Sequence, residues 1–173
     1  TLIEQEVIEL LAEEAGVLEE VAEITFRAMN GELDFEQSLR SRVATLAGLD
    51  TEAIARVRER VTVTRGVPEL VAGVQAAGGA VAVVSGGFHE VVDPIAARLG
   101  LDEWRANRLE AAEGRLTGAV IPPVVDAAAK AHALEEWATA RGIPLAQTVA
   151  IGDGANDLEM MARCGLAIGF DAK

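Results

Sequence analysis

The chain has 173 residues, half of them hydrophobic, and a mean hydropathy of +0.24, a composition that excludes an intrinsically disordered protein. No apolar run approaches the ~20 residues that a membrane-spanning helix needs, so the sequence predicts a soluble globular protein. The formal net charge of −13 disfavours nucleic acids and anionic membranes as partners, because binding to either requires clustered basic residues.

The first 62 residues show apolar residues at helical spacing and no strand pattern. Asp34, with Gln37 three residues later, resembles a capping box that starts the third helix. Four helices are expected, over residues 3–15, 18–29 and 35–46 and from about residue 51 to 57. This pattern predicts a compact helical unit.

After Pro68 the pattern changes to alternating helices and strands, which predicts an α/β unit with a parallel, doubly wound sheet. The boundary near residues 63–67 divides the chain into a helical unit, 1–65, and an α/β unit, 66–173. A weak hairpin signal lies around Glu113 and Gly114, and Asp126 is expected to cap a helix that reaches Arg141. The other expected elements are strands at 80–84, 148–151 and 166–170, and helices at about 70–77, 88–99 and 158–164.

The segment 152–157, Gly-Asp-Gly-Ala-Asn-Asp, follows a short apolar strand and precedes a helix. The carboxyl ends of strands are where open α/β sheets bind ligands. Gly152 and Gly154 permit close approach of the backbone, and Asp153 and Asp157 are hard oxygen donors that Mg²⁺ accepts. An Asx-turn followed by a helix cap would also use Asp and Asn. A turn needs one such residue and this loop has three, so we predict a cation site.

Two further motifs have an open interpretation. Ser85-Gly86-Gly87 ends a strand just before a helix, where a hydroxyl and backbone amides can hold a phosphate, although an ordinary strand-to-helix turn explains it equally well. Lys130 is the only lysine before Lys173. Its compact ammonium suits a phosphate oxygen, but by itself a lysine on a helix is more often solvated.

The remaining polar candidates have no supporting pattern. Glu6 and Arg42 are expected at the surface, and His89 is expected to be an exposed residue at a helix start. Met29 and Phe35 lie at helical spacing, which favours packing in the core. The single cysteine, Cys164, excludes an internal disulfide and fits a reducing compartment such as the cytoplasm.

Ser85-Gly86-Gly87, Lys130 and the 152–157 loop, in this order, resemble the haloacid dehalogenase superfamily of phosphotransferases. Residues 1–6, 29–35 and 38–42 extend the likeness, so that the whole chain is similar to the phosphoserine phosphatase family. The resemblance implies a Rossmann-like parallel-sheet core, 66–173, with an inserted four-helix cap, 1–65. It implies a phosphoric monoester hydrolase of serine biosynthesis that uses Mg²⁺ to convert O-phospho-L-serine to L-serine and phosphate through an aspartyl-phosphate. A cytoplasmic location is expected, and a homodimer is compatible with the sequence.

The same resemblance assigns roles to residues one position at a time. Ser85 and Lys130 would hold the transferring phosphoryl group with the Gly86 amide, and Asp153 would bind Mg²⁺. The cap would recognise the amino acid part of the substrate, with Glu6 at its ammonium and Arg42 at its carboxylate. The other implied site residues are Met29 and Phe35, which would line the pocket, and Asn156 and Asp157, which would order the metal and phosphate side.

The first motif of the family is Asp-x-Asp-x-Thr, and Thr1 resembles its closing threonine. The nucleophile and the general acid and base would then precede Thr1, so we expect this chain by itself to be inactive. The strand that carries them would also be missing from the centre of the sheet, which would leave 80–84 and 148–151 with unpaired edges, and further residues are expected after Lys173. Two alternatives remain open: a related phosphatase or phosphotransferase for another small phosphorylated metabolite, and a catalytically inactive fragment or binding module.

Overall fold

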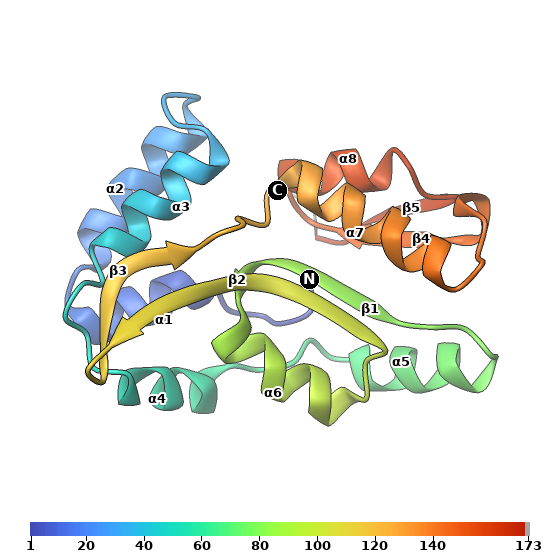
Figure 1. Ribbon diagram of the computed structural model, residues 1–173, viewed down its shortest axis with the longest axis horizontal. Coiled ribbons are helices and arrows are strands. Elements are labelled where there is room, and N and C mark those ends of the chain that lie inside the picture. The colour runs from blue at the N-terminus through green and yellow to red at the C-terminus, as the bar shows by residue number, and fades with distance from the viewer. Residues whose placement is uncertain (172–173) are drawn as a thin grey trace.

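A computed structural model describes residues 1–171 of the chain. Four helices come first, followed by helices and strands that alternate (Figure 1). The elements are α1 Val7–Ala15, α2 Leu18–Met29, α3 Phe35–Ala44, α4 Glu52–Arg60, α5 Val67–Ala76, β1 Ala82–Phe88, α6 His89–Leu99, β2 Glu103–Ala112, β3 Arg115–Ile121, α7 Ala127–Ala140, β4 Val149–Gly152, α8 Leu158–Met161 and β5 Leu166–Gly169, with short 3₁₀ turns at Leu145–Gln147 and Ala155–Asp157. Within residues 1–171, no helix has the length and apolar character needed to cross a membrane.

The four predicted N-terminal helices are present, and the third begins with the expected capping box. Asp34 Oδ1 accepts a hydrogen bond from the Gln37 amide at 2.7 Å, and the Asp34 amide donates to Gln37 Oε1 at 3.1 Å. The predicted start of the first helix at residue 3 is wrong. The chain before α1 is extended and pairs with the segment after α4, since the Glu4 amide donates to the Thr62 carbonyl and the Thr64 amide donates to the Leu2 carbonyl.

The strands form two sheets, with orders β1-β2-β3 and β4-β5 (Figure 1). The pairs β1–β2 and β4–β5 are parallel, as predicted, whereas β2 and β3 form an antiparallel hairpin. The hairpin turn lies at Glu113 and Gly114, both with positive φ, which confirms the weak signal there. In residues 1–171 no pairing joins β1 to β4.

One apolar core is shared by the four N-terminal helices and the hairpin sheet. Its buried members include Leu11 and Val43 from the helices and Phe88, Leu109 and Leu116 from the α/β part. Backbone hydrogen bonds also join the helices to the hairpin. In the loop between α3 and α4, the Gly48 amide donates to the Leu116 carbonyl of β3, and the Leu116 amide donates to the Leu49 carbonyl. The apolar core therefore crosses the predicted boundary at residue 65, and the division into two domains stays a prediction.

A smaller apolar cluster lies behind the 152–157 loop. It brings together Ala131 of α7, Ala150 of β4 and Met160 of α8, all buried. The cluster fixes α7 against the strand that leads into the loop, which sets the position of Lys130 relative to the loop.

Candidate active site

Asp157 holds the 152–157 loop together. Its Oδ2 accepts hydrogen bonds from the Asp153 amide at 3.1 Å and the Gly154 amide at 3.2 Å, and its Oδ1 accepts from Lys130 Nζ at 2.7 Å. The Asp157 and Lys130 residues are only 5% and 6% exposed, so a solvated Lys130 is excluded. A Cβ atom at residue 152 would lie 2.5 Å from the Cβ of Asp157, which is why the chain needs Gly152 at this point.

The buried pair can exist because both charges are satisfied. A buried ion is costly unless it is paired and hydrogen-bonded, and the Asp157 carboxylate receives three donors. Lys130 lies one turn into α7, whose first turn is capped by Asp126 through a 2.8 Å bond from the Ala129 amide. The first turn of α7 and the 152–157 loop together hold the Lys130 ammonium group at the carboxyl end of β4.

Asp153 presents a carboxylate beside this pair. Its Oδ2 accepts from the Thr1 amino group at 2.6 Å and from Thr1 Oγ1 at 2.8 Å. Burial raises the pKa of Asp153, but the hydrogen bonds from Thr1 and the nearby charge of Lys130 outweigh burial, so the pKa is lowered. The carboxylate is therefore ionised at neutral pH.

The donor chemistry of Asp153 fits Mg²⁺. This ion is commonly held by one or two protein carboxylates, with waters and a substrate phosphate as its other ligands. In the part of the chain that the structure describes, no three His, Cys, Asp or Glu side chains gather as a metal cluster. Asp153 would accordingly be the carboxylate that binds the ion, with Asp157 committed to Lys130 and the loop amides.

Ser85, Gly86 and Gly87 lie inside the end of β1, not after it, so the predicted end of the strand at residue 84 is wrong. Ser85 Oγ accepts a hydrogen bond from the Gly87 amide at 3.0 Å. A Cβ atom at residue 86 would lie 2.9 Å from Phe35 Cζ and 3.8 Å from Asn156 Nδ2. Residues from α3, β1 and the 152–157 loop thus meet at Gly86, where only a glycine leaves room.

The helical unit contributes Arg42, which lies two turns after Phe35 on the same face of α3. Arg42 Nε donates to the Ser38 carbonyl at 3.3 Å. Burial lowers the pKa of Arg42, and the negative charges of Glu6 and Glu9 oppose that shift. Glu6 therefore acts on Arg42 across two helices, a proximity that their sequence spacing did not indicate.

Met29 differs from the expectation of a core residue. It is the last residue of α2, and its side chain is 82% exposed. Helical periodicity predicts a buried face only when another element covers that face.

Sequence reasoning missed Asn107, a β2 residue that is only 1% exposed. Its Nδ2 donates to the Gly86 carbonyl at 2.8 Å, and its Oδ1 accepts from the Val125 amide at 2.7 Å. No local signal could have found it, because its partners lie 21 and 18 residues away.

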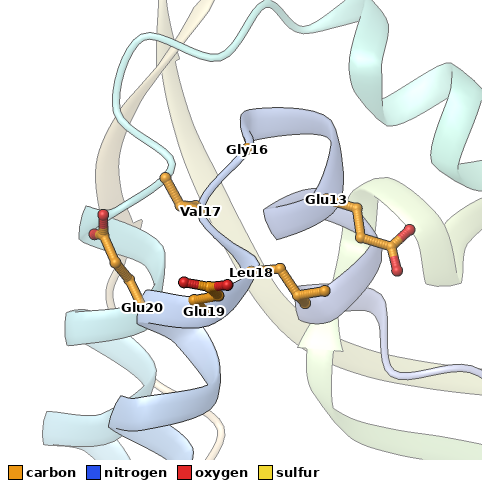
Figure 2. Close-up of a pocket in the computed structure, with 6 residues that line it drawn as sticks. All are labelled: Glu13, Gly16, Val17, Leu18, Glu19 and Glu20. Carbon is orange, nitrogen blue, oxygen red and sulfur yellow. The ribbon is translucent and has the colours of Figure 1, made fainter.

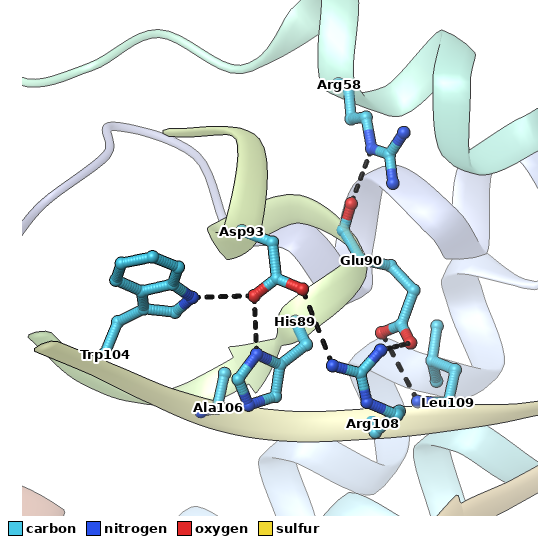
Figure 3. Close-up of polar contacts among 8 residues, drawn as sticks. All are labelled: Arg58, His89, Glu90, Asp93, Trp104, Ala106, Arg108 and Leu109. Carbon is cyan, nitrogen blue, oxygen red and sulfur yellow. Dashed lines mark hydrogen bonds and ion pairs between the residues drawn. The ribbon is translucent and has the colours of Figure 1, made fainter. Parts of the chain in front are cut away.

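The expectation of an exposed His89 is wrong. Its Nδ1 lies 2.6 Å from Asp93 Oδ1, a contact drawn in Figure 3, and the Ala106 amide donates to its Nε2 at 3.1 Å. Nε2 is thus the acceptor, so Nδ1 carries the proton and donates to Asp93. The Trp104 indole donates to the same Asp93 oxygen at 2.8 Å. The cluster fastens the start of α6 to β2.

Comparison with known proteins assigns this arrangement to a family. The sequence model of the haloacid dehalogenase-like hydrolases matches residues 1–162. The chain belongs to the haloacid dehalogenase-like hydrolase family. Phosphoserine phosphatases are its relatives: one from Streptomyces coelicolor is 54% identical over all 173 residues, which span 42% of that protein, and one from Streptococcus thermophilus is 50% identical over the same residues, which span 80% of it.

Solved structures agree with this assignment. A phospho-aspartyl intermediate analogue of phosphoserine phosphatase superposes with a TM-score of 0.94 at 48% identity, over the whole of this chain and 83% of that one. A substrate-bound phosphoserine phosphatase complex gives the same TM-score and identity, over 82% of its chain. The chain has the fold of haloacid dehalogenase-like hydrolases, an α/β fold with parallel strand pairs.

A surface pocket of this hydrolase lies away from the motif residues. It has a volume of about 480 Å³ and is formed at the connection between α1 and α2 (Figure 2). Its lining residues are Glu13, Gly16, Val17, Leu18, Glu19 and Glu20. Three carboxylates would repel a phosphate ester, so the size of this pocket does not make it the active site.

Proposed function

We propose that this chain serves the Mg²⁺-dependent hydrolysis of O-phospho-L-serine to L-serine and phosphate. The observation that carries the proposal is the 50% identity, over all 173 residues, to a phosphoserine phosphatase of which they span 80%. The reaction would pass through an aspartyl-phosphate, as one solved relative is described as an analogue of that intermediate. Its nucleophile would precede Thr1.

The phosphoryl group would be held at the ends of β1 and β4. Lys130 has three N–H donors, of which one is used on Asp157, so the others can bind phosphoryl oxygens. The Ser85 hydroxyl and the Gly86 amide would bind the same group from β1. Because Lys130 is fixed by a buried partner, its charge needs little reorganisation when negative charge develops on the phosphoryl oxygens.

Mg²⁺ at Asp153 would neutralise part of the phosphoryl charge. Asp153 would hold the ion through its ionised carboxylate, and Asp157 would keep the loop amides in place around it. Asn156 lies next to Gly86, where its amide would bind the phosphoryl group from the loop side.

The amino acid part of the substrate would be recognised by the helical cap. Phosphoserine carries an ammonium and a carboxylate, and Glu6 and Arg42 supply the complementary charges within electrostatic reach of each other. A guanidinium can bind a carboxylate through two parallel hydrogen bonds. Phe35, which contacts Gly86, would cover the methylene between the two ends, and Met29 would complete this wall of the pocket.

A substrate comparison in the full-length protein tests the proposal. Charged hydrogen bonds contribute roughly 1.5–3 kcal/mol, so Arg42→Ala should lower kcat/KM for phosphoserine about 10- to 100-fold. Phosphoethanolamine, which lacks the carboxylate, should be affected much less. Arg40→Ala is the matched control, since Arg40 lies on the same helix and pairs with Glu36 at the surface.

Two results would count against the assignment. If wild-type protein does not hydrolyse phosphoserine, the proposed function fails. If Arg42→Ala lowers the hydrolysis of both esters equally, the carboxylate is not recognised here, and a related phosphatase for another small metabolite takes its place. A cytoplasmic location, a role in serine biosynthesis and a homodimer stay predictions.

A further inference from the structure

The β1–β2 ladder is interrupted at the phosphate-binding segment. Parallel register runs regularly to the pair Val84–Arg105 and resumes at Phe88–Asn107, with a shift between them. Ser85, Gly86 and Gly87 of β1 therefore lie opposite Ala106 of β2 alone, so β1 has two residues in excess. Backbone groups in such a bulge lose their ladder partners and need others.

Two side chains replace the missing ladder bonds. The Asn107 amide group donates to the Gly86 carbonyl at 2.8 Å. On the preceding residue of β2, the Ala106 amide donates to His89 Nε2 at 3.1 Å (Figure 3). The bulge is thus closed by side chains.

Asn107 also reaches the helix that carries Lys130. Its Oδ1 accepts from the Val125 amide at 2.7 Å, and Val125 directly precedes Asp126, the N-cap of α7. The Lys130 amide in turn donates to the Asp126 carbonyl at 3.0 Å. One buried amide side chain therefore connects the bulge at Gly86 with the first turn of the Lys130 helix.

We propose that Asn107 is a positioning residue of the phosphoryl site, which sets the spacing between the Gly86 backbone and the start of the Lys130 helix. The inference rests on the proposed function for the roles of Gly86 and Lys130. Asn107 touches neither the phosphoryl group nor the metal in this assignment. Its effect on the reaction arises because it bonds both to the bulge and to the residue before the helix cap, and both segments must face the same phosphoryl group.

A near-isosteric apolar side chain would remove both bonds at once. In Asn107→Leu the partly buried Gly86 carbonyl and the buried Val125 amide would lose their partner, and each would shift to find another. Displacements of about 1 Å can cost roughly 100-fold in rate. We expect kcat for phosphoserine to fall about 10- to 100-fold and the inhibition constant for inorganic phosphate to rise about 10-fold.

The experiment measures kcat, KM and inhibition by inorganic phosphate in full-length wild type, Asn107→Leu and Asn107→Ser. The serine hydroxyl is too short to span both partners, but it retains a polar group in case the leucine variant does not fold. Val57→Ala is the matched control, because Val57 is fully buried in α4 and its loss destabilises the core without touching the bulge. Urea unfolding records the stability of each variant.

A positioning role requires lower kcat and weaker phosphate inhibition in the folded Asn107 variants, with Val57→Ala unchanged in both. Equal constants in wild type and Asn107→Ser would overturn the inference, as would a loss of stability with unaltered kinetics. If wild type does not hydrolyse phosphoserine, the proposed function fails separately. Protection of wild type and Asn107→Ser against thermal unfolding by inorganic phosphate then decides the Asn107 inference.

Discussion

Replacement of Asp157 by asparagine tests the most strongly coupled contact of the site. The substitution keeps the shape of the side chain but removes the charge that faces Lys130 Nζ at 2.7 Å. Both residues are buried, so Lys130 would be left as a buried ammonium without its carboxylate.

The expected loss follows from the geometry. Two unit charges at this distance attract by about 6 kcal/mol at an effective dielectric constant of about 20, and the cost of burying them offsets much of that. Breaking a buried pair by removing one partner costs about 3–5 kcal/mol. Asp157→Asn should therefore lower the free energy of unfolding by about 3–5 kcal/mol. Lys130→Met should lie at the lower end of this range, because Asp157 keeps two backbone donors.

Urea unfolding of wild type, the two single variants and the double variant gives the coupling energy of the pair. Contacting residues of this kind couple by about 1–3 kcal/mol, and we expect a value in that range. Additive losses, with a coupling energy below about 0.5 kcal/mol, would refute the argument that the pair acts as a unit.

Three further predictions concern the same loop and its surroundings. Gly152→Ala places a Cβ atom 2.5 Å from Asp157 and should lower the free energy of unfolding, measured in urea, by about 1–3 kcal/mol. Gly73→Ala, in a helix with open space around it, should cause no such loss. Equal free energies of unfolding in the two variants would contradict this prediction. Asp153→Asn should reduce turnover at least about 100-fold, and ordinary turnover would sink the metal assignment. Burial raises the pKa of Asp93, but hydrogen bonds from His89 and Trp104 outweigh burial, so the pKa is lowered. The ionised Asp93 therefore stabilises the fold above the unfolded pKa of about 3.9, and this stabilisation is lost as pH falls through the lower folded pKa. The difference in unfolding free energy between wild type and Asp93→Asn should shrink over that pH range.

Local patterns predicted the elements well because their causes are local. The capping box at Asp34 and the cap at Asp126 were both identified from residues within three positions. Errors arose where a distant segment decides the outcome. Residues before α1 have helical periodicity but pair with the segment after α4, and β1 continues past two glycines because its pairing with β2 resumes at Phe88.

The motifs of the candidate site could be predicted from the sequence, but the residues that pack and hydrogen-bond around those motifs could not. The 152–157 loop and Lys130 were singled out from chemistry and position, and the structure joins them at Asp157. The proximity of Glu6 to Arg42 came only from the family resemblance. Asn107 could not be predicted, because no sequence pattern marks a buried asparagine in a hairpin strand whose hydrogen-bond partners lie far away in the chain.

The shared core has a consequence for exchanging caps between members of this family. The loop between α3 and α4 is paired through its backbone with β3, and Leu109 and Leu116 of the hairpin pack with the helices. A chimera that transplants residues 1–65 alone would set a foreign helical unit on a native hairpin. Recombination that also moves the hairpin, residues 108–121, keeps each surface with its own counterpart. The packed unit formed by the four helices and the hairpin is therefore discontinuous in the sequence.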